Sequence, residues 1–143
     1  MSPMYIQEDP IRSLRILVVE DQQQTRVWIT DVLRQMGVKD VETASDGADA
    51  LEIVRRDPKS VDMIICDWAM PRMNGMDLLA AVRGLRPDLP FIMETGHGTK
   101  EHVLAARERG VAGFIVKPFS AAQLEVRIRT VAKTIRPRSN GAF

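Results

Sequence analysis

At 143 residues the chain is long enough for one domain with a substantial hydrophobic core. Its 20 Lys and Arg and 19 Asp and Glu nearly cancel to a net charge of +1, which gives no reason to expect binding to nucleic acid or membranes. The single cysteine, Cys66, excludes an internal disulfide and favours a cytoplasmic location, and the longest apolar run, residues 78–82, is too short to cross a bilayer.

Residues 1–13 are predicted to form a polar N-terminal lead-in that contains two prolines. Downstream, five short segments rich in apolar and β-branched residues predict strands. Their expected positions are residues 14–19, 38–44, 63–67, 90–94 and 112–116.

Each predicted strand is followed by a segment whose apolar residues recur at helical spacing. Gly37 is placed to end the first helix, and Thr99 is expected to cap the fourth. Ser120 and Gln123 form a capping box at the start of the fifth helix. The clearest apolar stripes are Ile29, Val32, Leu33 and Met36 in the first helix, Ala50, Leu51 and Val54 in the second, Leu78, Leu79, Val82 and Leu85 in the third, and Leu124, Ile128, Val131 and Ile135 in the fifth.

Five strands that alternate with five helices predict an α/β fold in which helices cover both faces of a parallel sheet. This pattern leaves the order of the strands open. We expect a single doubly wound domain over residues 14–136, followed by a flexible tail at residues 137–143.

Charged or hydroxyl side chains follow four of the predicted strands. In a parallel sheet these carboxyl ends lie along one edge, where open α/β sheets bind their ligands. Asp67 is expected to be the centre of the group, because it ends a buried apolar strand and an unpaired buried carboxylate is costly. The residues expected to join it are Glu20 and Asp21 after the first strand, Thr95 after the fourth and Lys117 after the fifth.

Three carboxylates and one lysine fit a divalent cation such as Mg²⁺, which prefers oxygen ligands and keeps several waters. A cluster that binds Mg²⁺ and leaves one carboxylate free suits transfer of a phosphoryl group onto that carboxylate. Lys117 and the cation would neutralise the phosphoryl charge, and the hydroxyl of Thr95 would donate a hydrogen bond to it.

Four motifs surround these residues: Val18-Val19-Glu20-Asp21, Asp67-Trp68-Ala69-Met70-Pro71 with Asn74-Gly75, Thr95-Gly96, and Gly113-Phe114-Ile115-Val116-Lys117-Pro118-Phe119. Together they resemble the receiver domain of bacterial two-component response regulators, and the single-domain chemotaxis type is most similar. The resemblance covers residues 13–135. It implies a flavodoxin-like fold with the strand order 2-1-3-4-5 and a cis peptide bond between Lys117 and Pro118.

By this resemblance, Asp67 accepts the phosphoryl group, and Lys117 and Thr95 hold the phosphoryl oxygens. A Mg²⁺ ion completes the implied site. Its implied ligands are the carboxylates of Asp21 and Asp67 and the backbone carbonyl of Ala69, with Glu20 acting through water.

The resemblance also implies partners. A histidine kinase or a histidine phosphotransfer protein would donate the phosphoryl group, and Phe114 occupies the position of an aromatic switch residue. A downstream target protein would bind the altered face around the fourth helix, fifth strand and fifth helix. We expect no DNA-binding output domain, and no catalysis beyond the protein's own phosphorylation and dephosphorylation.

Two other functions are compatible with this fold class. A receiver-fold module that binds partners without phosphorylation would lack the acceptor or the lysine, and this sequence has both. A flavodoxin-like cofactor binder or hydrolase would carry a Gly- or Ser/Thr-rich phosphate loop after the first strand, where this sequence has Gln22-Gln23-Gln24.

Two residues depart from the chemotaxis pattern beside the expected phosphoryl site. Ala69 replaces an amide and His97 replaces an acid, so both are candidates to tune the lifetime of the phosphoryl group. The last helix also carries a basic face, which is either a solvated surface or a docking surface for an anionic partner. This face consists of Arg129, Lys133 and Arg136.

Overall fold

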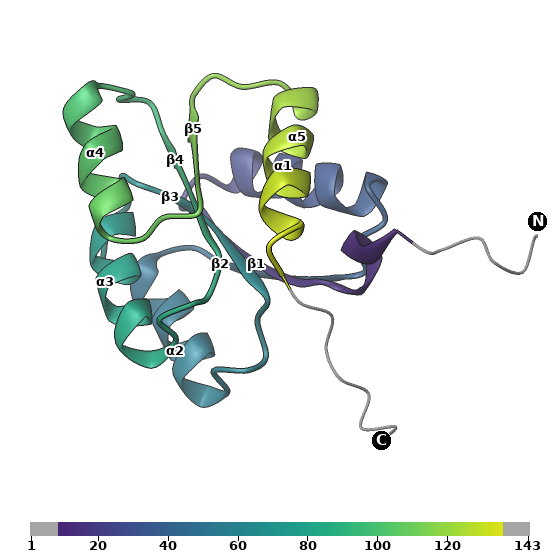
Figure 1. Ribbon diagram of the computed structural model, residues 1–143, viewed down its shortest axis with the longest axis horizontal. Coiled ribbons are helices and arrows are strands. Elements are labelled where there is room, and N and C mark those ends of the chain that lie inside the picture. Colours follow the sequence, from purple (N-terminus) through teal and green to yellow (C-terminus); the bar gives the residue numbers. More distant parts are fainter. Residues whose placement is uncertain (1–8, 136–143) are drawn as a thin grey trace, which may run out of the picture.

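The computed structural model describes residues 9–135, which form a five-stranded parallel sheet covered by helices on both faces (Figure 1). The strands are β1 (Arg15–Val19), β2 (Asp40–Ala44), β3 (Met63–Asp67), β4 (Phe91–Thr95) and β5 (Gly113–Val116). Their order in the sheet is β2-β1-β3-β4-β5. This order confirms the predicted doubly wound, flavodoxin-like fold.

The helices are α1 (Gln23–Gln35), α2 (Gly47–Arg56), α3 (Gly75–Leu85), α4 (Lys100–Glu108) and α5 (Ala121–Ala132). Figure 1 shows α1 and α5 on one face of the sheet and α2, α3 and α4 on the other. Thr99 caps α4, and the capping box of Ser120 and Gln123 starts α5, so both predicted caps are confirmed. Gly37 follows α1 at φ +99°, a left-handed conformation that glycine adopts without steric cost.

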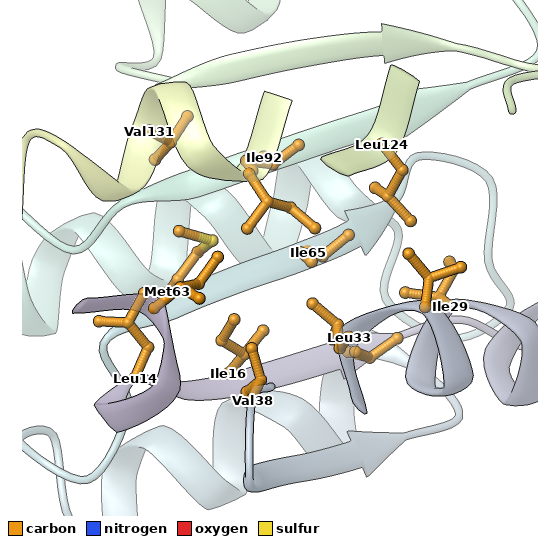
Figure 2. Close-up of a cluster of buried hydrophobic side chains, with 14 of the residues drawn as sticks. Leu14, Ile16, Ile29, Leu33, Val38, Met63, Ile65, Ile92, Leu124 and Val131 are labelled. Atoms are coloured by element: carbon orange, nitrogen blue, oxygen red, sulfur yellow. The ribbon is translucent and has the colours of Figure 1, made fainter. Parts of the chain in front are cut away.

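Side chains alternate along the central strands and divide the core into two halves. On β1, Ile16 and Val18 face α1 and α5, whereas Leu17 and Val19 face α2 and α3. Because both faces are covered, the strands are apolar along most of their length. Figure 2 shows the first half, in which Ile16, Ile65 and Ile92 of the sheet meet Ile29 and Leu33 of α1 and Leu124 and Val131 of α5.

The structure differs from the sequence-based expectation at a few boundaries. β2 begins at Asp40, and Val38 is buried in the turn before it. Leu85, predicted to belong to the apolar stripe of α3, ends that helix and is 38% exposed. In the predicted lead-in, residues Pro10–Ser13 form a short 3-10 helix, η2, whose Ile11 packs into the core.

The Lys117–Pro118 peptide bond is cis, as the family resemblance implied. Within residues 9–135, no helix combines the length and hydrophobicity that a membrane span needs. The predicted tail at residues 137–143 lies outside the described residues.

Candidate functional site

The carboxyl ends of four strands bring the main predicted site residues to one edge of the sheet. Glu20 follows β1, Asp67 and Thr95 are the last residues of β3 and β4, and Lys117 follows β5. The backbone N–H of Lys117 donates to the carbonyl of Thr95 at 2.7 Å, so the pairing of β4 with β5 continues up to the site.

Lys117 is the positive charge within this group. Its Nζ lies 3.2 Å from Asp67 Oδ1, 3.4 Å from Glu20 Oε2 and 3.8 Å from Glu94 Oε1. Burial alone would lower the pKa of Lys117, but the charges of Asp67, Glu20 and Glu94 outweigh burial and raise it. The ammonium group therefore remains charged at neutral pH.

Asp67 is 6% exposed and stands in a strongly perturbed environment. Burial, followed by the charge of Glu20, raises the pKa of Asp67 to about 6, and Lys117 opposes this shift. At neutral pH the Asp67 carboxyl group is therefore still ionised in most molecules, and an ionised carboxylate oxygen can act as a nucleophile.

Glu94 is a member of the site that the sequence reasoning missed. It precedes Thr95 on β4, and its Cα pairs with that of Asp67 across the sheet. Its side chain is 0% exposed, and neither carboxyl oxygen has a hydrogen-bond partner among the described residues. The sequence did contain a sign of this: Glu94 is a charged residue two positions after Ile92, where the alternation of a strand predicts another core residue.

Glu20 and Glu94 are close enough to share one proton. Burial, followed by the interaction with Glu20, raises the pKa of Glu94 to about 9. Burial would also raise the pKa of Glu20, but Glu94 and the charge of Lys117 outweigh it and lower that pKa. Glu94 is therefore the protonated partner and Glu20 the ionised one, since two carboxylates this close resist joint ionisation.

The acidic group at this edge fits a divalent cation. Glu20, Asp67 and Glu94 each have a carboxylate oxygen within 4.8 Å of one from each of the other two. Asp21, a predicted ligand, is exposed and lies outside this group. Burial and the charge of Glu20 are the larger causes of the raised pKa of Asp67, and the charge of Asp21 adds to them. Oxygen donors and excess negative charge are what Mg²⁺ prefers.

The loop after β3 carries Ala69, which is exposed. Contacts with the start of α2 fix the position of this loop. The N–H of Gly47 donates to the carbonyl of Met73 at 3.2 Å. Arg72, at φ +66°, donates from Nε to Asp46 Oδ2 at 2.8 Å. These contacts position the segment whose backbone carbonyl was predicted to face the cation.

Thr95 is 2% exposed, and its Oγ1 accepts a hydrogen bond from the backbone N–H of His97 at 3.0 Å. A threonine hydroxyl has one proton to donate in addition to the bonds it accepts. His97 itself is exposed, and its ring stacks on that of His102 with a centroid distance of 6.0 Å.

Trp68 connects the site to α4 and β5. Its ring centroid lies 4.8 Å from that of His102 on α4 and 6.4 Å from that of Phe114 on β5, both in edge-on geometry. His102 Nδ1 also lies 2.6 Å from Thr99 Oγ1. Sequence reasoning did not find the role of His102, because a polar residue on a weakly amphipathic helix does not reveal a contact with another element.

The predicted basic face of α5 is partly neutralised. Arg129 Nη1 lies 2.7 Å from Asp9 Oδ2, and its Nε lies 3.3 Å from Glu125 Oε1. Arg129 therefore connects α5 to the cap of η2. Lys133 is exposed, and Arg136 lies outside the described residues.

Known proteins share this sequence pattern and fold. Residues 16–129 match the response regulator receiver domain. The chain is 34% identical over 119 residues to chemotaxis protein CheY-3 of Vibrio cholerae, covering 82% of this chain and 90% of that protein. It is 36% identical over 123 residues to the chemotaxis protein CheY homolog of Campylobacter jejuni, covering 85% of this chain and 94% of that protein.

A similar fold occurs in the crystal structure of the CheX-CheY-BeF3-Mg²⁺ complex from Borrelia burgdorferi. The TM-score is 0.79 at 26% identity, over 82% of this chain and 88% of that chain. The matched residues include the carboxyl ends of all five strands and the acidic edge described above. The chain therefore belongs to the response regulator receiver domain family and is similar to its chemotaxis-type members.

Proposed function

We propose that this protein accepts a phosphoryl group on Asp67 from a histidine kinase or a histidine phosphotransfer protein. The observation that carries the proposal is the position of Lys117 Nζ, 3.2 Å from Asp67 Oδ1. A buried carboxylate supplies the nucleophile, and the adjacent ammonium is already in place to balance the incoming negative charge.

In the proposed transfer, an oxygen of Asp67 attacks the phosphorus of a phosphohistidine. The P–O bond forms as the P–N bond breaks, and the imidazole of the donor leaves as a neutral group after it takes up a proton from water. The product is an acyl phosphate on Asp67, and attack of water on its phosphorus regenerates the carboxylate and releases phosphate. The chemistry that this chain performs is thus limited to its own phosphorylation and dephosphorylation.

The residues that would hold Mg²⁺ are Asp21, Asp67 and the backbone carbonyl of Ala69, with Glu20 acting through water. The acidic group of Glu20, Asp67 and Glu94 beside Lys117 supports a cation at this edge, because its negative charge exceeds the positive charge of one ammonium. The roles of Asp21 and Ala69 rest on the family resemblance. A bound cation would supply positive charge for the phosphoryl oxygens. Lys117 and Thr95 would hold those oxygens from the protein side.

The output of the proposed switch is a change in the face formed by α4, β5 and α5. Thr95 would contact the phosphoryl group, and Phe114 on β5 would respond through its contact with Trp68. On this face Val116 is 45% exposed and Val126 is 65% exposed, which suits a downstream target protein. In the similar Borrelia structure, CheY is in a complex with CheX.

A receiver-fold module that signals without phosphorylation is the second candidate. It would not need a lysine in contact with a buried aspartate, and here both are present. The site therefore favours the phosphoacceptor. The cytoplasmic location remains a prediction from the sequence.

Intact mass after incubation with acetyl phosphate and Mg²⁺ tests the acceptor. We expect the wild type to gain the mass of one phosphoryl group and Asp67→Asn, which lacks the nucleophile, to gain none. The control Asp31→Asn changes an exposed aspartate on α1 and should be phosphorylated like the wild type. A phosphoryl mass on Asp67→Asn under the same conditions would show that the acceptor is another residue.

A further inference from the structure

Among the described residues, Glu94 is the buried carboxyl group to which the proposed function assigns no role. It is 0% exposed, and apart from the proton that it shares with Glu20, neither oxygen has a hydrogen-bond partner among the residues that the structure describes. Buried polar groups in proteins nearly always have a partner, because leaving one unpaired is costly. We therefore expect this carboxyl group to have a binding partner.

Lys117 is not the missing partner of Glu94. Its Nζ is 3.8 Å from Glu94 Oε1, which is too long for a hydrogen bond, and it lies closer to Asp67 at 3.2 Å and Glu20 at 3.4 Å. A proton between Glu20 and Glu94 engages one oxygen of Glu94 and leaves the other without a partner.

The spacing of the acidic group matches that of ligands on a common ion. Oxygen ligands lie about 2.0–2.6 Å from Mg²⁺ or Ca²⁺, so any two ligands of one ion lie within about 5 Å of each other. The carboxylate oxygens of Glu20, Asp67 and Glu94 lie within 4.8 Å of one another. Three carboxyl groups also face a single ammonium, that of Lys117.

We propose that Glu94 contributes a carboxylate oxygen to the divalent-cation site beside Asp67, in addition to the ligands named above. This inference rests on the proposed function, because it assumes that the acidic edge binds a cation. Binding of the cation displaces the proton of Glu94, and the carboxylate that forms adds both negative charge and an oxygen donor, which tightens the binding of Mg²⁺.

A Mg²⁺ titration of the unphosphorylated protein tests this proposal, with Trp68 fluorescence and calorimetry as readouts. We expect Glu94→Gln, which keeps the size but cannot form a carboxylate, to weaken Mg²⁺ binding by about tenfold or more. Glu42→Gln is the matched control, because it makes the same substitution at an exposed position on β2. We expect the control to change the dissociation constant by less than about twofold.

Glu94→Val is a second variant that removes both oxygens and restores an apolar strand residue. It keeps the test decisive if Glu94→Gln does not fold, and it should weaken Mg²⁺ binding at least as much. If both folded variants bind Mg²⁺ as tightly as the wild type, Glu94 is not a ligand, and the proposed function is unaffected. If the wild type gains phosphoryl mass but shows no saturable Mg²⁺ binding, the inference and the proposed cation site are both wrong, while Asp67 remains the acceptor.

Discussion

Asp67 differs from an ordinary surface aspartate because burial and Glu20 act on its pKa in one direction and Lys117 in the other. Burial and Glu20 raise its pKa to about 6, whereas Lys117 favours the charged form. In the proposed phosphorylation, the Lys117 ammonium, 3.2 Å from Asp67, would balance the charge of the incoming phosphoryl group. At the scale of single residues, the reactivity of Asp67 is therefore expected to depend on the side chains of the acidic group and on those that position water beside it.

The lifetime of the proposed acyl phosphate is predicted to depend on position 69. Hydrolysis needs a water in line with the phosphorus, and such positioning is a large part of phosphoryl-transfer catalysis. Ala69 is exposed and has no polar side-chain atom to hold that water. We expect Ala69→Asn to accelerate loss of the phosphoryl mass, measured as a time course after the donor is removed.

His97→Ala in the same assay tests whether the imidazole contributes to dephosphorylation. The exposed position of His97 predicts a smaller effect than that of Ala69→Asn. An Ala69→Asn protein whose phosphoryl half-life is unchanged or longer would rule out control of lifetime by a water held at position 69.

Glu94 is predicted to make the metal-free protein less stable as the pH rises. Its pKa is about 9 in the folded state against an ordinary value of 4.5. Between these values the folded state holds a proton that the unfolded chain has released, so the free energy of unfolding decreases with pH, by at most about 1.4 kcal/mol per pH unit. This contribution is fully present below the unfolded-state pKa and is lost as the pH rises through the folded-state pKa.

Glu94→Gln removes this titration. We therefore expect the melting temperature of the variant, measured with EDTA, to fall less than that of the wild type between about pH 5.5 and about pH 8.5. Glu42→Gln should follow the wild type. Parallel curves for Glu94→Gln and wild type would mean that Glu94 does not hold a proton in the folded protein.

At the scale of elements, the loop between β3 and α3 depends on α2 for its position. Gly47 begins α2, and a Cβ at this residue would lie 2.4 Å from the carbonyl oxygen of Met73. The close approach lets the Gly47 N–H bond that carbonyl, and the same loop carries Ala69. A helix on one face of the sheet thus orders the segment that directly follows Asp67.

Gly47→Ala is predicted to disturb both stability and the site. Because the added methyl group meets backbone, the loop or the helix must move, and we expect a loss of about 1–3 kcal/mol in the free energy of unfolding. Phosphorylation by acetyl phosphate should also slow. Gly84→Ala is the matched control within α3, where an added Cβ meets nothing within 4 Å, and it should stabilise the protein by about 0.5–1 kcal/mol.

Chemical denaturation and the rate of phosphoryl mass gain measure both effects of these glycine variants. Equal stability of Gly47→Ala and Gly84→Ala would show that the loop accommodates the methyl group, and the predicted link between α2 and the site would be wrong.

At the scale of the whole molecule, the proposed switch must carry information from the sheet edge to the face of α4, β5 and α5. Trp68 lies next to Asp67 and contacts both His102 of α4 and Phe114 of β5. Phosphorylation can shift such an equilibrium only through contacts that differ between the two states. The buried hydroxyl of Thr95 is the proposed source of that difference.

Thr95→Ala is predicted to separate phosphorylation from switching. The variant retains Asp67 and Lys117, so it should gain the phosphoryl mass, but it lacks the hydroxyl that contacts the phosphoryl group in the shifted state. We expect amide chemical-shift changes on phosphorylation near Asp67 in both proteins, and on β5 and α5 in the wild type alone. The control Thr43→Ala, at an exposed position of β2, should switch normally. Identical shift changes in Thr95→Ala and the wild type would rule out this coupling.

Local sequence patterns were sufficient to predict which segments form strands and helices and which residues end the strands. Apolar runs, helical spacing and caps act over a few residues, so the five strands, the cap at Thr99 and the capping box at Ser120 were predictable. Parallel pairing then requires the ends at Glu20, Asp67, Thr95 and Lys117 to share one edge. The strand order came from the family motifs, because local periodicity does not encode which strands are neighbours.

The other side chains that reach the site are brought there by long-range packing, which the sequence patterns did not reveal. Glu94 joins Asp67 because β3 and β4 pair in one register, and that register depends on the packing of the whole sheet. His102 meets Trp68 because α4 packs beside the loop after β3. Arg129 meets Asp9 across a separation of 120 residues, which turns part of a predicted basic face into a structural contact. In each case the partner lies far away in the chain, and local sequence patterns carry no information about contacts of that kind.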